Sequence, residues 1–196
     1  MSPDRNLKRI IIFASGAGTN AQAIISYFNT SDIAKVQLIV CNNPGAGVTT
    51  VAEKENIPVL IIEKKRFFEG DSYLPDFKNA KPDLLVLAGF LWKVPQQLID
   101  TYRGKIINIH PALLPKYGGK GMYGQYVHES VLTAGEVESG ITIHQVDEHY
   151  DNGDIIFQTG CPILENDTHE ALASRIHMLE HYHYPRVIEE VLKKMA

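Results

Sequence analysis

Cysteine is scarce in this sequence, because Cys41 and Cys161 are the only two among 196 residues. Two cysteines are too few for a disulfide framework. A chain of this length buries about 70% of its unfolded surface, so it needs neither a disulfide nor a metal to fold. We therefore expect two reduced core cysteines in a cytosolic protein, although a single bridge is also compatible with the count.

An excess of positive charge is also absent. Lys and Arg number 19 against 23 Asp and Glu, which gives a formal net charge of −4. Non-specific nucleic-acid binding depends on a strongly basic surface, so we expect no nucleic-acid partner. The balance leaves room for a local pocket that binds a small anion.

Long hydrophobic runs are missing as well. A membrane helix requires ~20 apolar residues, and the longest run here, 84–92, is interrupted by Gly89. The apolar run at 10–14 is short and leads into a glycine loop, so it is not a signal peptide. Repeats, low-complexity tracts and linkers are lacking too. We therefore expect one domain over residues 1–196, in a cytoplasmic protein without a membrane partner that acts on small molecules as a monomer or homodimer.

Strand and helix patterns alternate along the first hundred residues. Residues 9–14 are a continuous apolar run, typical of a strand buried on both faces, and apolar residues from Ala21 to Phe28 repeat at helical spacing. Further strands are expected at 36–41, 58–62, 84–88, 105–109, 141–146 and 155–159, and further helices at 47–55, 95–102 and from 168 onward. This pattern predicts an α/β fold with a doubly wound, mostly parallel, Rossmann-like central sheet and helices on both faces.

The second half of the chain begins with a segment rich in glycine and proline. Residues 110–124 are expected to form a long irregular loop, and such loops tend to be functional. The closing helix is expected to have Asp167 as its N-cap, with Glu170 completing a capping box. Pro185 is expected to break or kink this helix.

A glycine loop, Ser-Gly-Ala-Gly-Thr-Asn at 15–20, lies between the first strand and the first helix. Glycines let a ligand approach the backbone, and a helix N-terminus offers free N–H groups, so this loop favours a phosphate site over a plain tight turn. A dinucleotide would require an acid at the end of the second strand, where Cys41-Asn42-Asn43 stands instead. A mononucleotide-like phosphate therefore fits better.

Asn108 and His110 lie two residues apart at the end of the fifth expected strand, so both should point to one face. A neutral donor beside an imidazole suits stabilisation of a developing oxyanion, although the pair could also be structural. Asp147 to Asp154 form an acidic stretch whose glycine does not fall where a calcium loop needs it. One of its carboxylates could instead reach a histidine and raise the pKa of that histidine, or the stretch could be a solvated turn.

His177, Glu180 and His181 match a short pattern of zinc metalloproteases. Glu180 also extends an apolar row on the closing helix, which would place its carboxylate at a pocket edge, suited to a substrate amine or hydroxyl. We expect no metal site, and a zinc hydrolase stays an alternative.

Five motifs together resemble a known family. Ser-Gly-x-Gly-Thr-Asn at 15–20, Leu-Ala-Gly-Phe at 87–90, Asn-Ile-His-Pro-Ala-Leu-Leu-Pro at 108–115, Ser-Gly-Ile-Thr-Ile-His at 139–144 and Asp-x-Gly at 151–153 occur in order. Over essentially the whole chain, they are similar to the phosphoribosylglycinamide formyltransferases, within the wider 10-formyltetrahydrofolate transferase superfamily. The resemblance implies transfer of a formyl group from 10-formyltetrahydrofolate, as co-substrate, to the amine of glycinamide ribonucleotide in purine synthesis.

The resemblance also implies a role for each residue that matches the family's motifs. It implies a ribotide phosphate site in the N-terminal half of the chain, and folate and catalytic loops in the C-terminal half. The catalytic residues are Asn108, His110 and Asp151; the ribotide residues are Gly18, Thr19, Asn20 and Glu180; the folate residues are Leu91, Trp92, Lys93, Val94, Asn108 and Asp147. Lys64, Lys65 and Arg66 are nearby candidates for contact with the folate glutamate.

Other enzymes that use 10-formyltetrahydrofolate are the nearer alternatives. A tRNA formyltransferase carries an additional C-terminal domain and the related hydrolase an additional N-terminal one, so a chain of 196 residues is expected to be the bare glycinamide enzyme. We expect direct attack by the amine, with Asn108 and His110 both stabilising the developing oxyanion. Asp151 keeps His110 basic enough for this role, and a water carries the proton from the amine to the leaving nitrogen. A sugar formyltransferase and a non-catalytic nucleotide-binding module also stay open.

Overall fold

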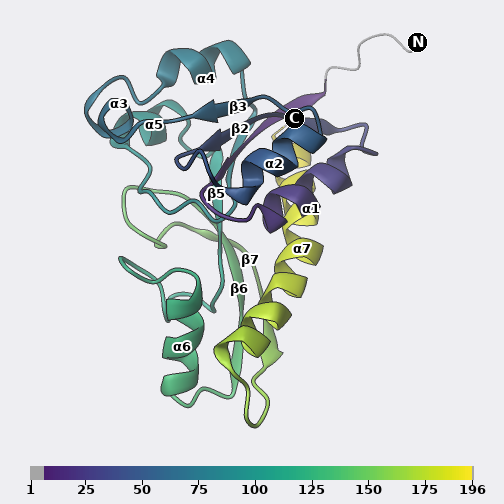
Figure 1. Cartoon of the computed structure of the whole chain (residues 1–196), viewed down its shortest axis with the longest axis vertical. Helices are drawn as coiled ribbons and strands as arrows, with labels where there is room; N and C mark the ends of the chain where they lie inside the picture. Colours follow the sequence, from purple (N-terminus) through teal and green to yellow (C-terminus); the bar gives the residue numbers. More distant parts are fainter. Residues whose placement is uncertain (1–6, 196) are drawn as a thin grey trace.

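A seven-stranded sheet forms the middle layer of the structure, a computed structural model in which residues 7–195 are described (Figure 1). Its strand order is β3-β2-β1-β4-β5-β6-β7; the first five strands of the chain pair in parallel, whereas β6 and β7 are antiparallel. The strands are β1 (Lys8–Ala14), β2 (Ala34–Cys41), β3 (Val59–Ile61), β4 (Leu84–Leu87), β5 (Ile106–His110), β6 (Glu138–Gln145) and β7 (Ile155–Pro162). The predicted doubly wound, mostly parallel sheet is confirmed.

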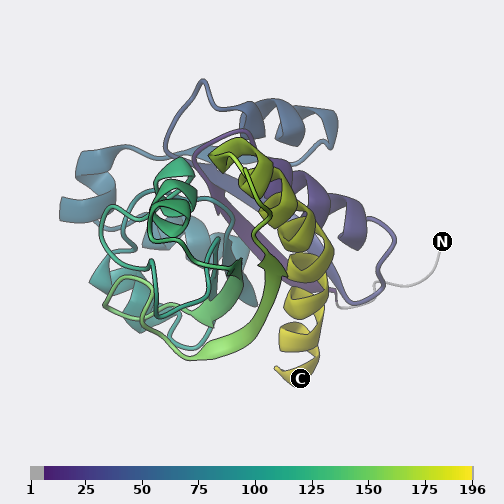
Figure 2. The ribbon, with the colours of Figure 1, turned by 90° about the horizontal axis from the view of Figure 1, so that it is seen from below.

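Helices cover both faces of this sheet. They are α1 (Thr19–Phe28), α2 (Gly47–Lys54), α3 (Lys64–Glu69), α4 (Leu74–Ala80), α5 (Gln96–Thr101), α6 (Gln125–Thr133) and α7 (His169–Lys194). Helices α1, α2, α6 and α7 pack in one hydrophobic cluster and α3, α4 and α5 in the other. Figure 2 shows α7 running alongside α1.

The central strand β1 explains why its sequence is continuously apolar. Ile10 and Ile12 belong to one cluster and Ile11 and Phe13 to the other, and all four are fully buried. A strand covered on both faces has no side that prefers polar residues, so alternation disappears. The carboxyl ends of β1, β4 and β5 lie side by side because these neighbouring strands are parallel.

The closing helix differs from its prediction at two points. Thr168, not Asp167, is the N-cap: its side chain accepts a hydrogen bond from the Ala171 amide, whereas Asp167 forms an ion pair with Arg175. The helix also continues through Pro185 to Lys194, so the predicted break is wrong. Buried side chains on both sides of Pro185 pack against the sheet and compensate for the hydrogen bond that proline cannot make.

Helices α3, α4 and α6 were not expected from the sequence. The first two have 6 and 7 residues, which is too short for a repeating apolar stripe. Tertiary packing holds them instead, because Phe67 and Phe77 enter the core beside Phe13. Residues 111–124 form the predicted irregular loop.

Two further sequence predictions concern cysteines and membranes. Cys41 and Cys161 are both free and buried. Across residues 7–195, every helix is too short or too polar to span a bilayer.

Candidate active site

A cleft of about 710 Å³ opens where the chain leaves β1, β4 and β5. Ligands bind at the carboxyl ends of the strands in open α/β sheets, because loops from several strands converge there. All the predicted site residues line this cleft: Gly18, Thr19, Asn20, Leu91, Trp92, Lys93, Val94, Asn108, His110, Asp147, Asp151 and Glu180. The structure therefore brings together residues that lie up to 162 positions apart in the sequence, from Gly18 to Glu180.

Asp151 faces three polar side chains in the cleft. Its Oδ2 lies 3.6 Å from Nδ1 of His110, and its Oδ1 lies 3.6 Å from Nε2 of His144 and 3.5 Å from Nδ2 of Asn108. The Gly119 amide donates to Oδ2 at 2.9 Å. Burial raises the pKa of Asp151, but His144, His110 and the Gly119 amide together lower it by more than burial raises it. The pKa of Asp151 is therefore below its usual range. Asp151 is thus an ionised carboxylate at the centre of the group.

The ring of His110 is almost completely buried, and its orientation is set by a backbone group. Its Nε2 lies 2.7 Å from the carbonyl oxygen of Tyr117, which can only accept, so Nε2 carries the proton. Burial lowers the pKa of His110; the Asp151 charge and the Tyr117 carbonyl oppose this without reversing it. Asp151 does raise the pKa of His110, as the sequence analysis expected, but desolvation lowers that pKa by more. His110 is therefore neutral at pH 7.

His144 orients the Asn108 amide. Its Nδ1 lies 2.7 Å from the carbonyl oxygen of Gln145 and donates to it, so Nε2 accepts from Asn108 Nδ2 at 3.2 Å whenever Nε2 carries no proton. The other N–H of Asn108 faces Asp151 Oδ1 at 3.5 Å, a distance that is long for a hydrogen bond. That N–H is available to a ligand oxygen.

The glycine loop lies at the N-terminus of α1. Gly18 is the N-cap residue with a φ of 82°, and no side chain caps the helix. Helix α2 lies directly against the loop, because a Cβ on Gly18 would be 2.7 Å from Cα of Val48. The loop therefore presents an uncapped, positive helix end to the cleft, as an anion site requires.

Glu180 of α7 closes the same end of the cleft. Its Oε2 accepts a hydrogen bond from Asn20 Nδ2 at 2.8 Å, and Oδ1 of Asn20 is buried without a partner among the described residues. Burial raises the pKa of Glu180 to about 7. The two side chains form a polar corner with spare hydrogen-bonding capacity beside the glycine loop.

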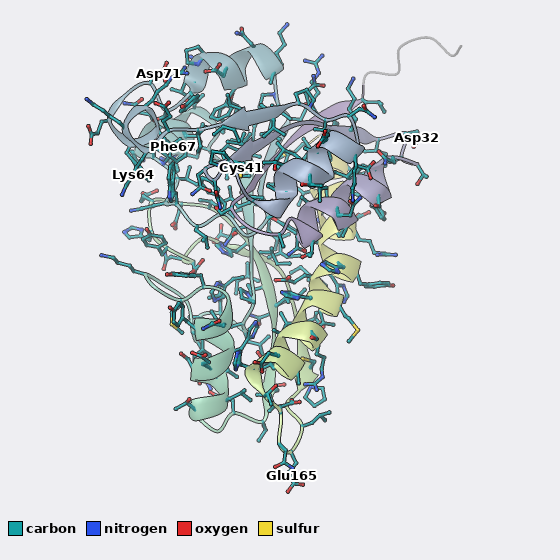
Figure 3. The ribbon with its side chains drawn as sticks, viewed as in Figure 1. Asp32, Cys41, Lys64, Phe67, Asp71 and Glu165 are labelled. Carbon is teal, nitrogen blue, oxygen red and sulfur yellow. The ribbon has the colours of Figure 1, made fainter. Side chains whose placement is uncertain are left out.

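The opposite wall is apolar and aromatic. Trp92 packs against Phe67 and Phe90. The backbone amide of the half-exposed Leu91 donates a hydrogen bond to Ser15 Oγ at 2.9 Å. Lys93 Nζ lies 5.5 Å from the ring centre of Tyr150, so it joins the two walls. Lys64, Lys65 and Arg66 do not line the cleft; all three lie on α3, where Figure 3 labels Lys64 beside Phe67.

Comparison with known proteins identifies the family. Residues 8–188 match the formyl transferase family. This chain is a member of that family. A formyl transferase with 38% identity is the phosphoribosylglycinamide formyltransferase of Bacillus subtilis, aligned over 192 residues that cover 95% of each chain.

Two other relatives show how widely this formyl transferase domain is used. The trifunctional purine biosynthetic protein adenosine-3 of Drosophila melanogaster is 39% identical over 196 residues, which are 96% of this chain and 14% of the insect protein. This chain thus spans a small part of that relative. The solved structure of glycinamide ribonucleotide transformylase 1 from Geobacillus kaustophilus has 39% identity and a TM-score of 0.86, covering 95% of this chain and 99% of that one.

The zinc alternative is not favoured in this formyl transferase. The rings of His177 and His181 are stacked with centroids 6.1 Å apart, and Glu180 is engaged by Asn20. Within residues 7–195, the histidine, cysteine and acidic side chains include no group of three placed to hold a metal ion.

His144 was missed as a site residue by the sequence analysis. The residue ends the Ser-Gly-Ile-Thr-Ile-His motif, but a histidine in a strand carries no local sign of its partner. The signal lies in the strand pairing, because the antiparallel register places His144 opposite Asn108. His128, which also lines the cleft, was missed as well: it lies on α6, the helix that the sequence did not predict.

Proposed function

We propose that this formyl transferase moves the formyl group of 10-formyltetrahydrofolate to the amine of N1-(5-phospho-D-ribosyl)glycinamide, in de novo purine synthesis. The observation that carries the proposal is the convergence of Asn108, His110 and Asp151 within one cleft that also holds the glycine loop. The names of the similar proteins point to the same substrate.

The ribotide occupies the side of the cleft beside α1 in this proposal. The amides of the 18–20 loop and the helix dipole hold its phosphate. Asn20 and Glu180 take its polar groups, because the buried Asn20 oxygen needs a donor and the Glu180 carboxyl, with a pKa of about 7, both donates and accepts. This arrangement orients the glycinamide amine toward Asn108.

The folate substrate fits the rest of the cleft. A volume of about 710 Å³ is sufficient for a small-molecule site, for which the usual range is roughly 300–1,000 Å³. Leu91, Trp92 and Val94 provide apolar surface for a flat ring, and Asp147 lies on the facing loop. 10-Formyltetrahydrofolate supplies the formyl carbon and the leaving nitrogen.

The chain contributes orientation, charge stabilisation and proton handling. The free N–H of Asn108 donates to the formyl oxygen as negative charge develops there. The bond between the amine nitrogen and the formyl carbon forms, and the bond from that carbon to the leaving nitrogen breaks. The proton that the amine loses passes through a water to Nδ1 of His110, where the imidazolium faces Asp151 at 3.6 Å, and returns through the water to the leaving nitrogen. Holding two substrates together supplies much of the acceleration, with no metal and no covalent enzyme intermediate.

The test is an assay of tetrahydrofolate production with the purified chain, 10-formyltetrahydrofolate, and glycinamide ribonucleotide present or absent. We expect production that depends on the ribotide and yields formylglycinamide ribonucleotide in equal amount. Production without the ribotide would assign a hydrolase instead. A cytoplasmic location and a monomeric or homodimeric state stay predictions.

A further inference from the structure

A buried hydroxyl, that of Thr142, holds the backbone of the loop that follows β5. Thr142 of β6 is fully buried; its Oγ1 donates to the carbonyl oxygen of Ala112 at 2.6 Å and accepts from the amide of Leu114 at 3.0 Å. Gln158 of β7 lies opposite Thr142 in the strand register, and its Nε2 donates to the same Oγ1 at 2.8 Å and to the carbonyl oxygen of Leu114 at 3.0 Å. The hydroxyl therefore uses its one proton and both lone pairs.

These contacts lie outside the cleft. Neither Thr142 nor Gln158 is among the residues that line it, so neither touches a ligand there. Residues 111–117 form no helix or strand, so the position of this loop depends on such side-chain contacts.

The far end of the same loop contacts the catalytic group. The carbonyl oxygen of Tyr117 accepts from His110 Nε2 at 2.7 Å, and two residues later the Gly119 amide donates to Asp151 at 2.9 Å. The Tyr117 carbonyl therefore decides which nitrogen of His110 is protonated. Of the other groups around His110, Asp151 and His144 come from the β6–β7 segment and His128 from α6.

We propose that the Thr142 hydroxyl, braced by Gln158, is a positioning residue for His110. It fixes residues 112–114, and through them the Tyr117 carbonyl that holds the His110 ring with its proton on Nε2. This inference rests on the proposed function for its kinetic consequences but not for its tautomer consequence. A hydroxyl on the far side of the loop thus determines that Nδ1 of His110 faces Asp151 as a proton acceptor.

The experiment compares Thr142→Val with Thr142→Ser in the full chain. Valine has nearly the same shape but no hydroxyl, whereas serine retains the hydroxyl and loses the methyl group. We expect Thr142→Val to lower kcat by about tenfold or more with both KM values within about twofold, since a displaced catalytic group slows chemistry more than binding. The hydrogen bond to the Tyr117 carbonyl raises the pKa of His110. Losing that bond should therefore lower the His110 pKa and move the acid limb of the kcat/KM profile to lower pH. Thr142→Ser should restore both.

A second readout does not need the reaction. Nitrogen-15 spectra of the histidine rings should show His110 as the Nε2–H tautomer in the original chain and in Thr142→Ser, and a mixture in Thr142→Val. Wild-type kcat, acid limb and tautomer in a folded Thr142→Val would overturn the proposal, as would failure of serine to restore them. Gln158→Leu, at an exposed position, should give a weaker change in the same direction if Thr142→Val does not fold. An inactive original chain with the expected tautomer changes would contradict the proposed function alone.

Discussion

Asp151 links the three other polar groups of the cleft. It lies within 3.6 Å of both ring nitrogens that face it and within 3.5 Å of the Asn108 amide. Because His110 is neutral in the resting cleft, the charge of Asp151 matters most when that ring takes up a proton. Its contribution should therefore be larger in the reaction than in binding.

Replacing Asp151 tests this directly. Asp151→Asn should lower kcat by on the order of 10²-fold, while both KM values change little, because an amide cannot stabilise the imidazolium. Steady-state kinetics with each substrate varied will measure the split. Asp154→Asn, at an exposed position of the same segment, is the matched control and should retain full activity. Equal activity of the two variants would remove Asp151 from the proposed mechanism.

Glu180 should make stability depend on pH in an unusual direction for a carboxyl group. Its folded pKa is raised to about 7 by burial, so the stability it contributes is complete below its unfolded pKa and is lost as pH rises through about 7. Glu180→Gln removes this loss. The gain in unfolding free energy over the original chain should be roughly 2–3 kcal/mol larger at pH 8 than at pH 5.

Urea unfolding at the two pH values measures this gain. Glu165→Gln, at the exposed tip between β7 and α7 (Figure 3), is the control and should show no such dependence. The same Glu180→Gln protein should have a higher KM for the ribotide, because a glutamine amide cannot replace the Glu180 carboxyl in binding the polar groups of the ribotide. A gain that is equal at both pH values would mean that Glu180 is not desolvated.

At the scale of elements, the junction of β1, α1 and α2 sets the shape of the phosphate site. Two glycines of the loop differ in what they require: Gly18 has a φ of 82° and lies against Val48, whereas a Cβ on Gly16 would meet no atom within 4 Å. The sequence Ser-Gly-Ala-Gly does not reveal this difference.

The two glycines therefore predict different outcomes on substitution by alanine. Gly18→Ala should destabilise the chain by about 2 kcal/mol or more, because a left-handed backbone and a close contact with α2 both oppose a side chain. It should also raise the KM for the ribotide, with less effect on the KM for folate. Gly16→Ala is the control, and thermal unfolding with kinetics compares the pair. Similar losses in both variants would refute the argument from local geometry.

For the whole molecule, α7 joins the N-terminal and C-terminal halves of the chain (Figure 1). Tyr184 is completely buried, and its hydroxyl donates to the carbonyl oxygens of Leu87 at 2.9 Å and Ile107 at 3.3 Å. One side chain thus connects the last helix to β4 and β5, the strands whose following loops line the cleft.

Tyr184→Phe should lower the free energy of unfolding by about 1–2 kcal/mol, because two buried carbonyls lose a donor that water cannot replace. The midpoint of urea unfolding measures this loss. Tyr182→Phe, two residues earlier and more than half exposed, should leave the midpoint unchanged. Identical midpoints for the two variants would show that the hydroxyl contributes nothing.

Local patterns in the sequence were sufficient for much of this protein. The continuous apolar runs predicted the strands of the parallel sheet, since burial on both faces removes alternation. The glycine loop and the pair Asn108 and His110 were found because each sits just after such a strand, where α/β folds bind ligands. The sequence could not predict α3 and α4, which are too short to carry a helical repeat, or the N-cap at Thr168.

Tertiary structure alone decided how the site residues act on one another. His144 became part of the site through an antiparallel register with a partner 36 residues away. The neutral state of His110 follows from burial, which depends on every element packed around the ring rather than on its neighbours in the chain. Sequence by itself determined which chemical groups are present and at which sheet edge they emerge. Only folding set their distances and dielectric surroundings, because Coulomb and desolvation energies depend on separation and burial in space.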